Sequence, residues 1–290
     1  MVVFAAQGDP RRSMELLWRR STAGRSTADE GDAGSGNRPG PRPGLSVEAI
    51  VEAAIALADA EGIGALSMRA VGQRLGRSGM ALYTYVPGKS ELLDLMYDQV
   101  HAELPTDYPT VDGWRAALTA WADDLWACYL RHPWVLQVSS ARPVLGPHEY
   151  ALLETAARIL GPTGLPARVL WRTIGTVIHF VRGVALTVSQ SRLARQVTGS
   201  TDDEWWLARS AMLTEVAPDF ADHFPTLTRL ERAGAFQVDD ESVPYLEQEA
   251  RETFQNGLDV LLAGIQVTVD QSHDALRDAT ERKSGSLPTE

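Results

Sequence analysis

A short stretch of this sequence collects positive charge in a chain that is otherwise acidic. The 290 residues carry a formal net charge of −11 at pH 7, yet no Asp or Glu lies between Glu61 and Glu91. The basic residues inside this stretch are Arg69, Arg74, Arg77 and Lys89. Cations grouped in this way favour contact with phosphates, because each contact releases counterions condensed on a nucleic acid. We therefore expect a local DNA-binding surface.

The basic stretch coincides with two short helices expected on either side of a turn. Ser67 is a good N-cap for a helix over Met68–Leu75, and Gly76 follows it as glycine often follows a helix end. A second short helix is expected over Met80–Val86, ended by Pro87. Two short helices joined by a turn containing glycine predict a helix-turn-helix, whose second helix enters the major groove.

The second helix has a narrow apolar side, formed chiefly by Leu82 and Val86. Its other residues are free to face a groove: Ser78, Met80, Ala81, Tyr83, Thr84 and Tyr85. The positive end of the helix dipole also favours phosphate. An ordinary helical bundle with surface arginines is the alternative explanation of the same pattern.

Apolar residues at three- and four-residue steps predict a helix before this pair and another after it. The first follows the N-cap Ser46 and ends at Glu61-Gly62, and the second runs from Lys89 to Leu104. Residues 45–104 are thus expected to form the DNA-binding domain, in which the first three helices make a three-helix helix-turn-helix.

The remainder of the chain is also predicted to be helical. No stretch alternates with period two for long enough to form a sheet, so the fold class is all-α. We expect a C-terminal effector-binding and dimerisation domain over 111–266 and a flexible tail over 267–290. Its helices are expected at 113–131, 134–139, 148–160, 166–196, 202–215, 219–231 and 244–265.

Residues 1–44 are predicted to be a disordered extension, because Gly, Ser, Pro, Asp and Arg dominate much of the segment. The residues 14–20 could form a short amphipathic turn. The segment is interpreted either as a flexible tail or as a basic arm that touches DNA phosphates.

Other classes of protein find little support. Cys128 is the only cysteine, so an intrachain disulfide and a cysteine-based zinc site are excluded. The histidines show no metal-ligand spacing, and no phosphate-binding loop or catalytic motif is present, so we expect no cofactor, no metal and no enzymatic activity. No apolar run approaches membrane-spanning length, and a cytoplasmic protein that binds no membrane is expected.

Residues 66–76 and 81–93 resemble the N-terminal domain of the tetracycline-repressor (TetR) family. The pattern LYxHFxxKxxLL of that family is matched in register by Leu82-Tyr83, Tyr85-Val86, Lys89 and Leu92-Leu93. The resemblance implies DNA contacts from Ser67, Arg69, Gly79, Met80, Ala81, Tyr83, Thr84, Tyr85 and Lys89. One departure is Gly79, which has no side chain with which to read a base.

The C-terminal part resembles the tetracycline-repressor branch of that family. The motif Phe254–Ile265 and the segments Leu130–Pro133, Arg142-Pro143 and Val177–Phe180 occur in the expected order. The resemblance implies that helices 166–196 and 244–265 meet their twofold mates in a homodimer, which would bind a palindromic operator on double-stranded DNA.

The resemblance also implies a small-molecule site lined by Trp121, Leu125, Arg142, Pro143 and His179. Val138 replaces the metal-holding histidine of the tetracycline repressor, and Trp121 replaces its drug-binding amide. A hydrophobic or aromatic effector, bound without magnesium, is therefore expected. Trp121 and His179 have a second interpretation as ordinary core residues.

The predicted function is that of a repressor released from its operator by a small molecule. An activator, or a regulator without an effector, fits the same motifs. A helical enzyme or scaffold is a more distant alternative, and the basic stretch argues against a scaffold.

Overall fold

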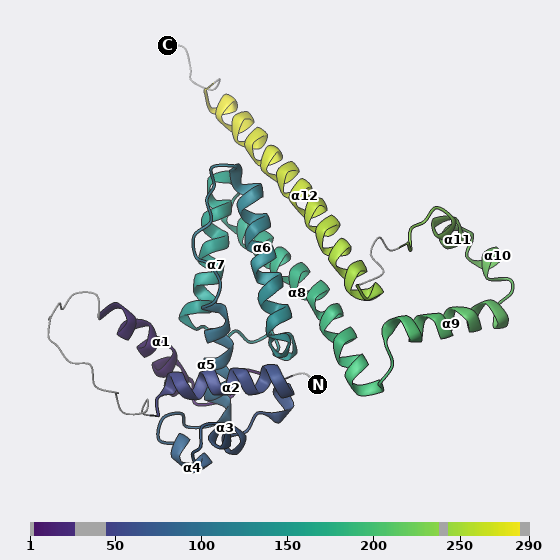
Figure 1. Ribbon diagram of the computed structural model, residues 1–290. Helices are drawn as coiled ribbons and strands as arrows, with labels where there is room; N and C mark the ends of the chain where they lie inside the picture. Colours follow the sequence, from purple (N-terminus) through teal and green to yellow (C-terminus); the bar gives the residue numbers. More distant parts are fainter. Residues whose placement is uncertain (1–2, 27–44, 238–242, 285–290) are drawn as a thin grey trace, which may run out of the picture. The chain divides into compact units, whose positions relative to one another are not determined.

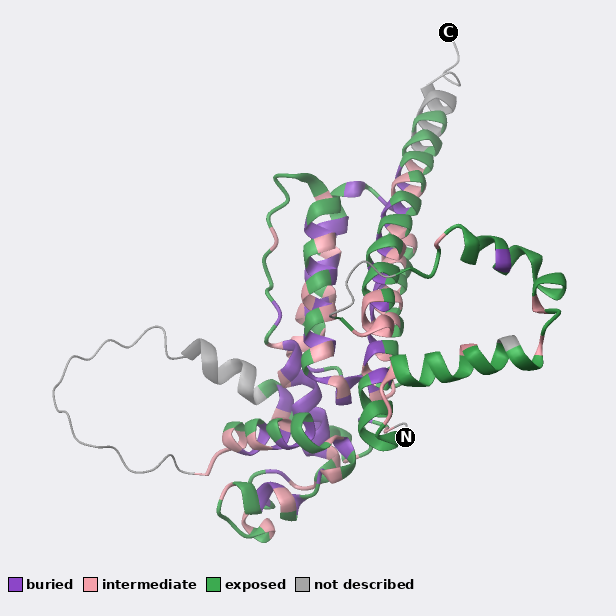
Figure 2. Cartoon of the chain, turned by 45° about the vertical axis from the view of Figure 1, so that its right-hand side comes forward, coloured by how far each residue is buried: buried purple, intermediate pink, exposed green. Residues whose placement is uncertain are grey.

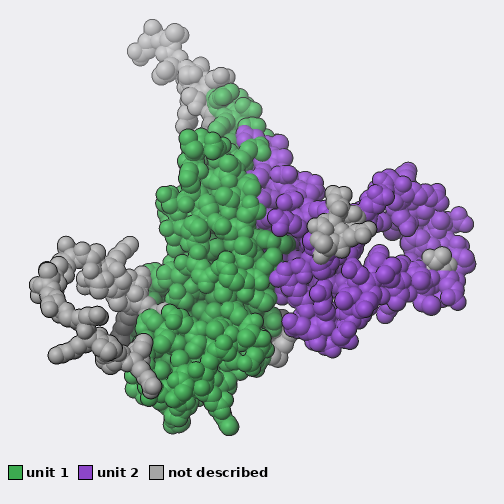
Figure 3. Space-filling view, viewed as in Figure 1, with its two compact units in different colours: residues 1–178, 268–290 green, residues 179–267 purple. Residues whose placement is uncertain are grey.

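The computed structural model of the chain describes residues 3–26, 45–237 and 243–284 (Figure 1). Within these ranges the regular structure is helical, and Val3 and Val138 form an isolated parallel bridge. The predicted all-α class is confirmed. The chain divides into two compact units, residues 1–178 with 268–290, and residues 179–267 (Figure 3).

The predicted helix-turn-helix elements form near their expected positions. They are α2 (Val47–Glu61), a 3₁₀ turn (Ile63–Ala65), α3 (Met68–Arg74), α4 (Gly79–Leu82) and α5 (Lys89–His101). Ser46, Ser67 and Ser78 cap α2, α3 and α4, each accepting a backbone N–H bond on its side-chain oxygen. The apolar residues of α2 that recur at three- and four-residue steps are all buried: Ile50, Val51, Ala54, Leu57 and Ala58.

The second helix of the motif is shorter than predicted. α4 ends at Leu82, and Tyr83–Tyr85 continue as a turn in which Val86 N–H donates to the Leu82 carbonyl oxygen at 2.9 Å. Pro87 contributes to the early end, since it has no N–H to donate to the Tyr83 carbonyl and its ring would clash with that carbonyl in a helix. Leu82 and Val86 are both fully buried, so the predicted apolar side of this element is confirmed.

The first unit continues with α6 (Gly113–Arg131), a 3₁₀ segment (Pro133–Gln137) and α7 (Pro147–Leu160), followed by a 3₁₀ turn (Gly161–Thr163). Buried residues concentrate in α5 and on the facing sides of α6 and α7 (Figure 2). These helices form the core behind the helix-turn-helix.

The second unit contains the C-terminal part of α8 (Ala167–Thr198) and the N-terminal part of α12 (Tyr245–Ser284). Between them lie α9 (Asp202–Val216), α10 (Phe220–His223) and α11 (Pro225–Arg232). The helix expected at 219–231 is thus divided, because Pro225 starts a new helix. Within this unit α8 packs on α12, with the rings of Phe180 and Phe254 stacked at 6.0 Å.

Two predicted disordered segments contain helices. The prediction for residues 1–44 is wrong over residues 3–26, where α1 (Pro10–Ser26) forms and buries Leu17. The prediction of a flexible tail over 267–290 is wrong up to Ser284, because α12 continues through a stretch without Gly or Pro. The predictions for residues 27–44 and 285–290 lie outside the described residues.

Candidate nucleic-acid interface

Two glycines set the close approach of α3 and α4. A Cβ added at Gly72 would lie 2.9 Å from both the Arg77 carbonyl oxygen and the Gly79 nitrogen. A Cβ at Gly79 would lie 3.1 Å from the Cα of Arg69. Each glycine therefore allows backbone to pack on backbone, which holds the second helix at a fixed distance from the first. Gly79, predicted as a recognition-helix position, serves this packing instead of offering a side chain.

The predicted DNA contacts form one largely exposed set around α3 and α4. Met80 is 76% exposed, while Tyr83 and Tyr85 are 47% and 38% exposed. Ser67, Arg69, Ser78, Thr84 and Lys89 are also exposed, and Ala81 and Gly79 are partly covered. The structure thus brings these residues to the surface of one small motif. The Ser67 and Ser78 hydroxyls both cap helices, so any phosphate contact they make would be added to capping.

The electrostatics of the motif favour an anionic partner. Arg69, Arg74, Arg77 and Lys89 are exposed. Glu91, the acid that follows them in sequence, is 7% exposed and accepts the Asp9 N–H bond at 3.2 Å on Oε1. Since this carboxylate is turned inward, the surface of the motif carries the positive charge with little local compensation.

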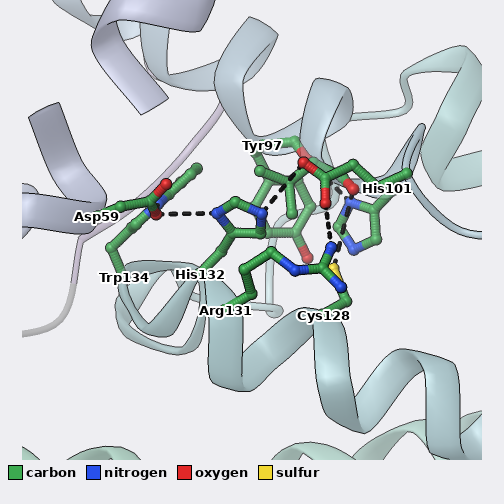
Figure 4. A network of polar contacts seen from close by, with 9 residues as sticks. Asp59, Tyr97, His101, Cys128, Arg131, His132 and Trp134 are labelled. Atoms are coloured by element: carbon green, nitrogen blue, oxygen red, sulfur yellow. Dashed lines mark hydrogen bonds and ion pairs between the residues drawn. The ribbon is translucent and has the colours of Figure 1, made fainter. Parts of the chain in front are cut away.

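A polar junction around the buried side chains of His132 and Trp134 joins the helix-turn-helix to the helices behind it (Figure 4). His132 Nδ1 lies 2.9 Å from Asp59 Oδ1, near the end of α2, and Nε2 lies 3.2 Å from Glu103 Oε1, just after α5. Trp134 Nε1–H donates to Asp59 at 2.8 Å, and Arg131 pairs with Glu103. His132 sits between two carboxylates, so both of its ring nitrogens can donate only when the imidazole is protonated.

The charge state of His132 follows from these contacts. Burial lowers the pKa of His132, but the hydrogen bonds and charges of Asp59 and Glu103 outweigh burial and raise the pKa above its ordinary value of 6.5. Sequence reasoning missed this junction, because its members lie on three separate helical elements. The Leu130–Pro133 segment was singled out in the sequence and contains His132, but it gave no indication of the partners Asp59 and Glu103.

The predicted effector residues belong to three different elements of the chain. Trp121 and Leu125, one turn apart on α6, are 1% and 0% exposed. Arg142 and Pro143 are exposed on the loop before α7, where the Arg142 guanidinium lies 5.8 Å from the centre of the Phe4 ring. His179 is exposed on α8 and belongs to the second unit. The indole Nε1–H of Trp121 is buried without a hydrogen-bond partner among the described residues.

A cavity that the sequence did not predict lies within the second unit. It measures about 400 Å³ and is lined by residues of α9–α11 and the segments beside them, including Trp206, Leu213, Phe220 and Phe236. The aromatic residues in and beside α9 were the feature of the sequence that could have indicated this cavity. Among the residues that the structure describes, no group of three or more His, Cys, Asp or Glu side chains is placed to hold a metal ion.

Comparison with known proteins identifies the chain. Residues 50–96 match the domain family described as bacterial regulatory proteins, tetR family, and residues 108–269 match the tetracyclin repressor-like C-terminal domain. The chain belongs to the TetR family. Membership makes it a DNA-binding regulator and agrees with the exposed basic motif at α3 and α4.

Named relatives within the TetR family include a repressor and a structure with a bound small molecule. The chain is 42% identical over 214 residues to the transcriptional repressor DrrR1 of Streptomyces coeruleorubidus, covering 73% of this chain and 74% of that protein. It is 26% identical to the TetR-family protein ActR of Streptomyces coelicolor in complex with actinorhodin, with a TM-score of 0.62, covering 78% of this chain and 99% of ActR. It is 27% identical over 232 residues to the class D tetracycline repressor of Escherichia coli, and the match covers 77% of this chain and 90% of that protein.

The helix α8 combines unusual length with an apolar composition. α8 is long and apolar enough to cross a membrane, judged by length and hydropathy alone, and 22% of its most apolar window is buried. Helices that form the interfaces of globular proteins meet the same criteria, so this finding is weak evidence for a membrane span.

Proposed function

We propose that this TetR-family chain is a cytoplasmic transcriptional repressor that binds a palindromic operator as a homodimer and is released by a small aromatic effector. The observation that carries the proposal is the exposed basic surface of α3 and α4, held by backbone contact between two glycine-containing helices. The DrrR1 relative, named as a repressor, favours repression over activation.

Homodimer formation is supported by apolar residues that remain uncovered on α8 and α12. Trp171 and Val197 of α8 are 60% and 75% exposed, and Val260 of α12 is 64% exposed. A second copy of the chain would cover such surface, and two copies related by a twofold axis would place their recognition helices on successive half-sites. On this proposal the length and apolar character of α8 serve dimerisation rather than membrane insertion.

The effector proposal rests on Trp121. A buried N–H group without a partner is costly, so an acceptor oxygen on a bound molecule would complete it. ActR, whose structure contains actinorhodin, favours a ligand for this domain as well. We infer an aromatic effector with an acceptor oxygen that binds without magnesium, since Val138 stands where the tetracycline repressor has a metal-holding histidine.

A regulator without an effector is the second candidate, favoured by the complete burial of Trp121 and Leu125 as ordinary core residues would be. Titration with actinorhodin, followed by tryptophan fluorescence and by release of DNA, distinguishes the two candidates. Release without added magnesium supports the effector proposal, and an unchanged DNA complex favours the second candidate.

The test of DNA recognition is selection from a random duplex library by the purified full-length chain. We expect enrichment of a palindrome whose half-sites lie about one helical turn apart. A gel shift on the selected sequence, weakened by Arg69→Ala but not by Arg229→Ala, an exposed arginine of the second unit, would support the proposed surface. Failure to enrich any sequence would contradict it.

A further inference from the structure

The N-terminal segment crosses the first unit and contacts several separate elements. Val3 lies along Gln137–Ser139: its N–H donates to the Gln137 carbonyl at 2.9 Å and its carbonyl accepts the Ser139 N–H at 2.7 Å. Farther along, Trp18 Nε1–H donates to the Leu145 carbonyl at 3.2 Å, and its ring lies 6.2 Å from that of Tyr150 on α7. Residues 3–18 therefore contact both ends of the 137–145 loop.

The same segment also binds two buried carboxylates of α5. Asp94, 1% exposed, accepts the Ala6 N–H at 2.7 Å on one oxygen and the Ser13 hydroxyl at 3.0 Å on the other. Glu91 accepts the Asp9 N–H at 3.2 Å. A Cβ added at Gly8 would lie 2.2 Å from Glu91 Oε1, so glycine allows the chain to press on this side chain.

One residue of the N-terminal segment and one residue of the 137–145 loop have backbone with positive φ. Among the described residues, Ala6 and Leu145 are the non-glycine positions with positive φ, at 53° and 61°. Each N–H is held by a carboxylate, Ala6 by Asp94 and Leu145 by Glu149 at 2.7 Å. Such backbone is unfavourable for residues with a Cβ and persists only where surrounding contacts fix it.

A third acid extends the connection along α5. Asp98 Oδ1 accepts the backbone N–H groups of His148 and Glu149 at 2.9 and 3.0 Å, at the start of α7. Glu91, Asp94 and Asp98 are three and four residues apart, so they share one side of the helix. That side is covered by the N-terminal segment and by α7, which explains why α5 is buried beyond its apolar stripe.

We propose that residues 3–18 are an intramolecular strap that fastens the 137–145 loop to α5, so that a change at the loop is transmitted to the DNA-binding motif. The loop carries Arg142 and Pro143, and α5 begins at Lys89, the proposed phosphate contact. The strap thus joins a proposed effector region to a proposed DNA contact. This inference rests on the proposed function, because it concerns how effector binding and operator binding influence each other.

Gly8→Leu should loosen the strap, because the new side chain would meet the Glu91 carboxylate on which this segment packs. Ser13→Ala is a milder second variant that removes only the hydroxyl bond to Asp94. Arg11→Ala is the matched control, because the Arg11 side chain is 89% exposed on the same helix. Circular dichroism establishes that each variant retains its helical content.

Hydrogen exchange of the full chain, with and without the selected operator, tests transmission. In the unaltered protein and in Arg11→Ala, operator binding should slow exchange of the Ser139 amide about fivefold or more, within the range of typical couplings. Gly8→Leu should lose most of this protection, and Ser13→Ala, which leaves Glu91 in place, should reduce it with an unchanged salt slope.

Three results would overturn the proposal. Protection of the Ser139 amide in Gly8→Leu equal to that in the unaltered protein would show that the strap transmits nothing. A reduced salt slope in Ser13→Ala, which leaves Glu91 in place, would show that the segment touches DNA directly. If the unaltered protein binds no selected duplex, the proposed function itself fails, which the gel shift reveals before any variant is compared.

Discussion

Two helix pairs in this protein pack closely at glycine residues, but different kinds of atoms lie against the glycine in each pair. In α3 and α4, the space beside Gly72 and Gly79 is filled by backbone atoms of the partner helix and of the turn between the two helices. In α8 and α12, the space beside Gly257 is filled by the ring of Phe180, whose Cζ would lie 2.5 Å from an added Cβ. A backbone contact can relieve a clash only by moving a helix, whereas a side-chain ring can rotate.

The difference matches the tasks proposed for the two pairs. Base contacts require fixed spacing between the recognition helix and its support, and backbone packing supplies that spacing. The α8–α12 pair, proposed to form the homodimer, reads no bases, so an aromatic side chain against glycine, a contact that can change, is sufficient there. The comparison therefore predicts a rigid DNA-binding pair and an adaptable second pair.

The largest effect is expected at Gly72. Gly72→Val should lower the free energy of unfolding by about 3 kcal/mol, because the added atoms meet backbone in a closely packed site, and should abolish operator binding. Chemical denaturation and gel shifts measure the two effects. Gly64→Ala is the control, since nothing lies within 4 Å of a Cβ there. A Gly72→Val protein that binds its operator normally would contradict the claim that the α3–α4 pair is rigid.

A smaller effect is expected at Gly257. Gly257→Ala should cost about 1 kcal/mol of unfolding free energy, because the Phe180 ring can turn away. Denaturation of Gly257→Ala and of Gly257→Ala combined with Phe180→Leu measures the contact, and the second substitution should recover part of the loss. A cost equal to that of Gly72→Val would mean that the two pairs are equally rigid.

The His132 junction should make stability depend on pH. The folded-state pKa lies above 6.5, so the stabilising contribution is fully present below the unfolded pKa and is lost as pH rises through the folded pKa. His132→Gln should flatten this dependence and cost about 2 kcal/mol at low pH, the scale of hydrogen bonds to charged groups. His223→Gln, at an exposed histidine, is the control. Denaturation curves from pH 5.5 to 8.5 that are parallel for the unaltered protein and His132→Gln would contradict this assignment.

The smallest structural change is Trp121→Phe, which removes the indole N–H but retains an aromatic ring. We expect about fivefold weaker binding of actinorhodin, from the loss of a hydrogen bond of about 1 kcal/mol, with operator affinity of the free protein unchanged. Fluorescence titration of the remaining tryptophans and gel shifts measure the two affinities. If operator affinity falls as well, Trp121 supports the DNA-binding motif rather than a ligand.

The sequence predicted the local features of the DNA-binding motif and not its long-range contacts. Ser67 as a cap and Leu82 as a core residue follow from neighbours within a few positions, and both are confirmed. The strap could not be predicted, because it depends on pairs such as Ala6 and Asp94, which are 88 residues apart. The composition of residues 1–44 as a whole indicated disorder and concealed the apolar residues of α1.

For a related reason, the sequence accounts for the burial of the proposed effector residues only where they share one helix. Trp121 and Leu125 lie one turn apart on a single helix, so their shared burial follows from periodicity. Arg142 was assigned to the pocket by resemblance, whereas the structure places its guanidinium against Phe4 of the strap. A family pattern does not contain the N-terminal segment that this chain adds there.

The most direct test of the DNA-binding account is the salt dependence of operator affinity. Binding of the selected palindrome should weaken steeply with salt, and Lys89→Ala should lower both the affinity and the magnitude of the logarithmic salt slope, the latter by about one unit. Arg229→Ala should match the unaltered protein in both. An affinity and a slope that do not change in Lys89→Ala would contradict the assignment of this surface to DNA.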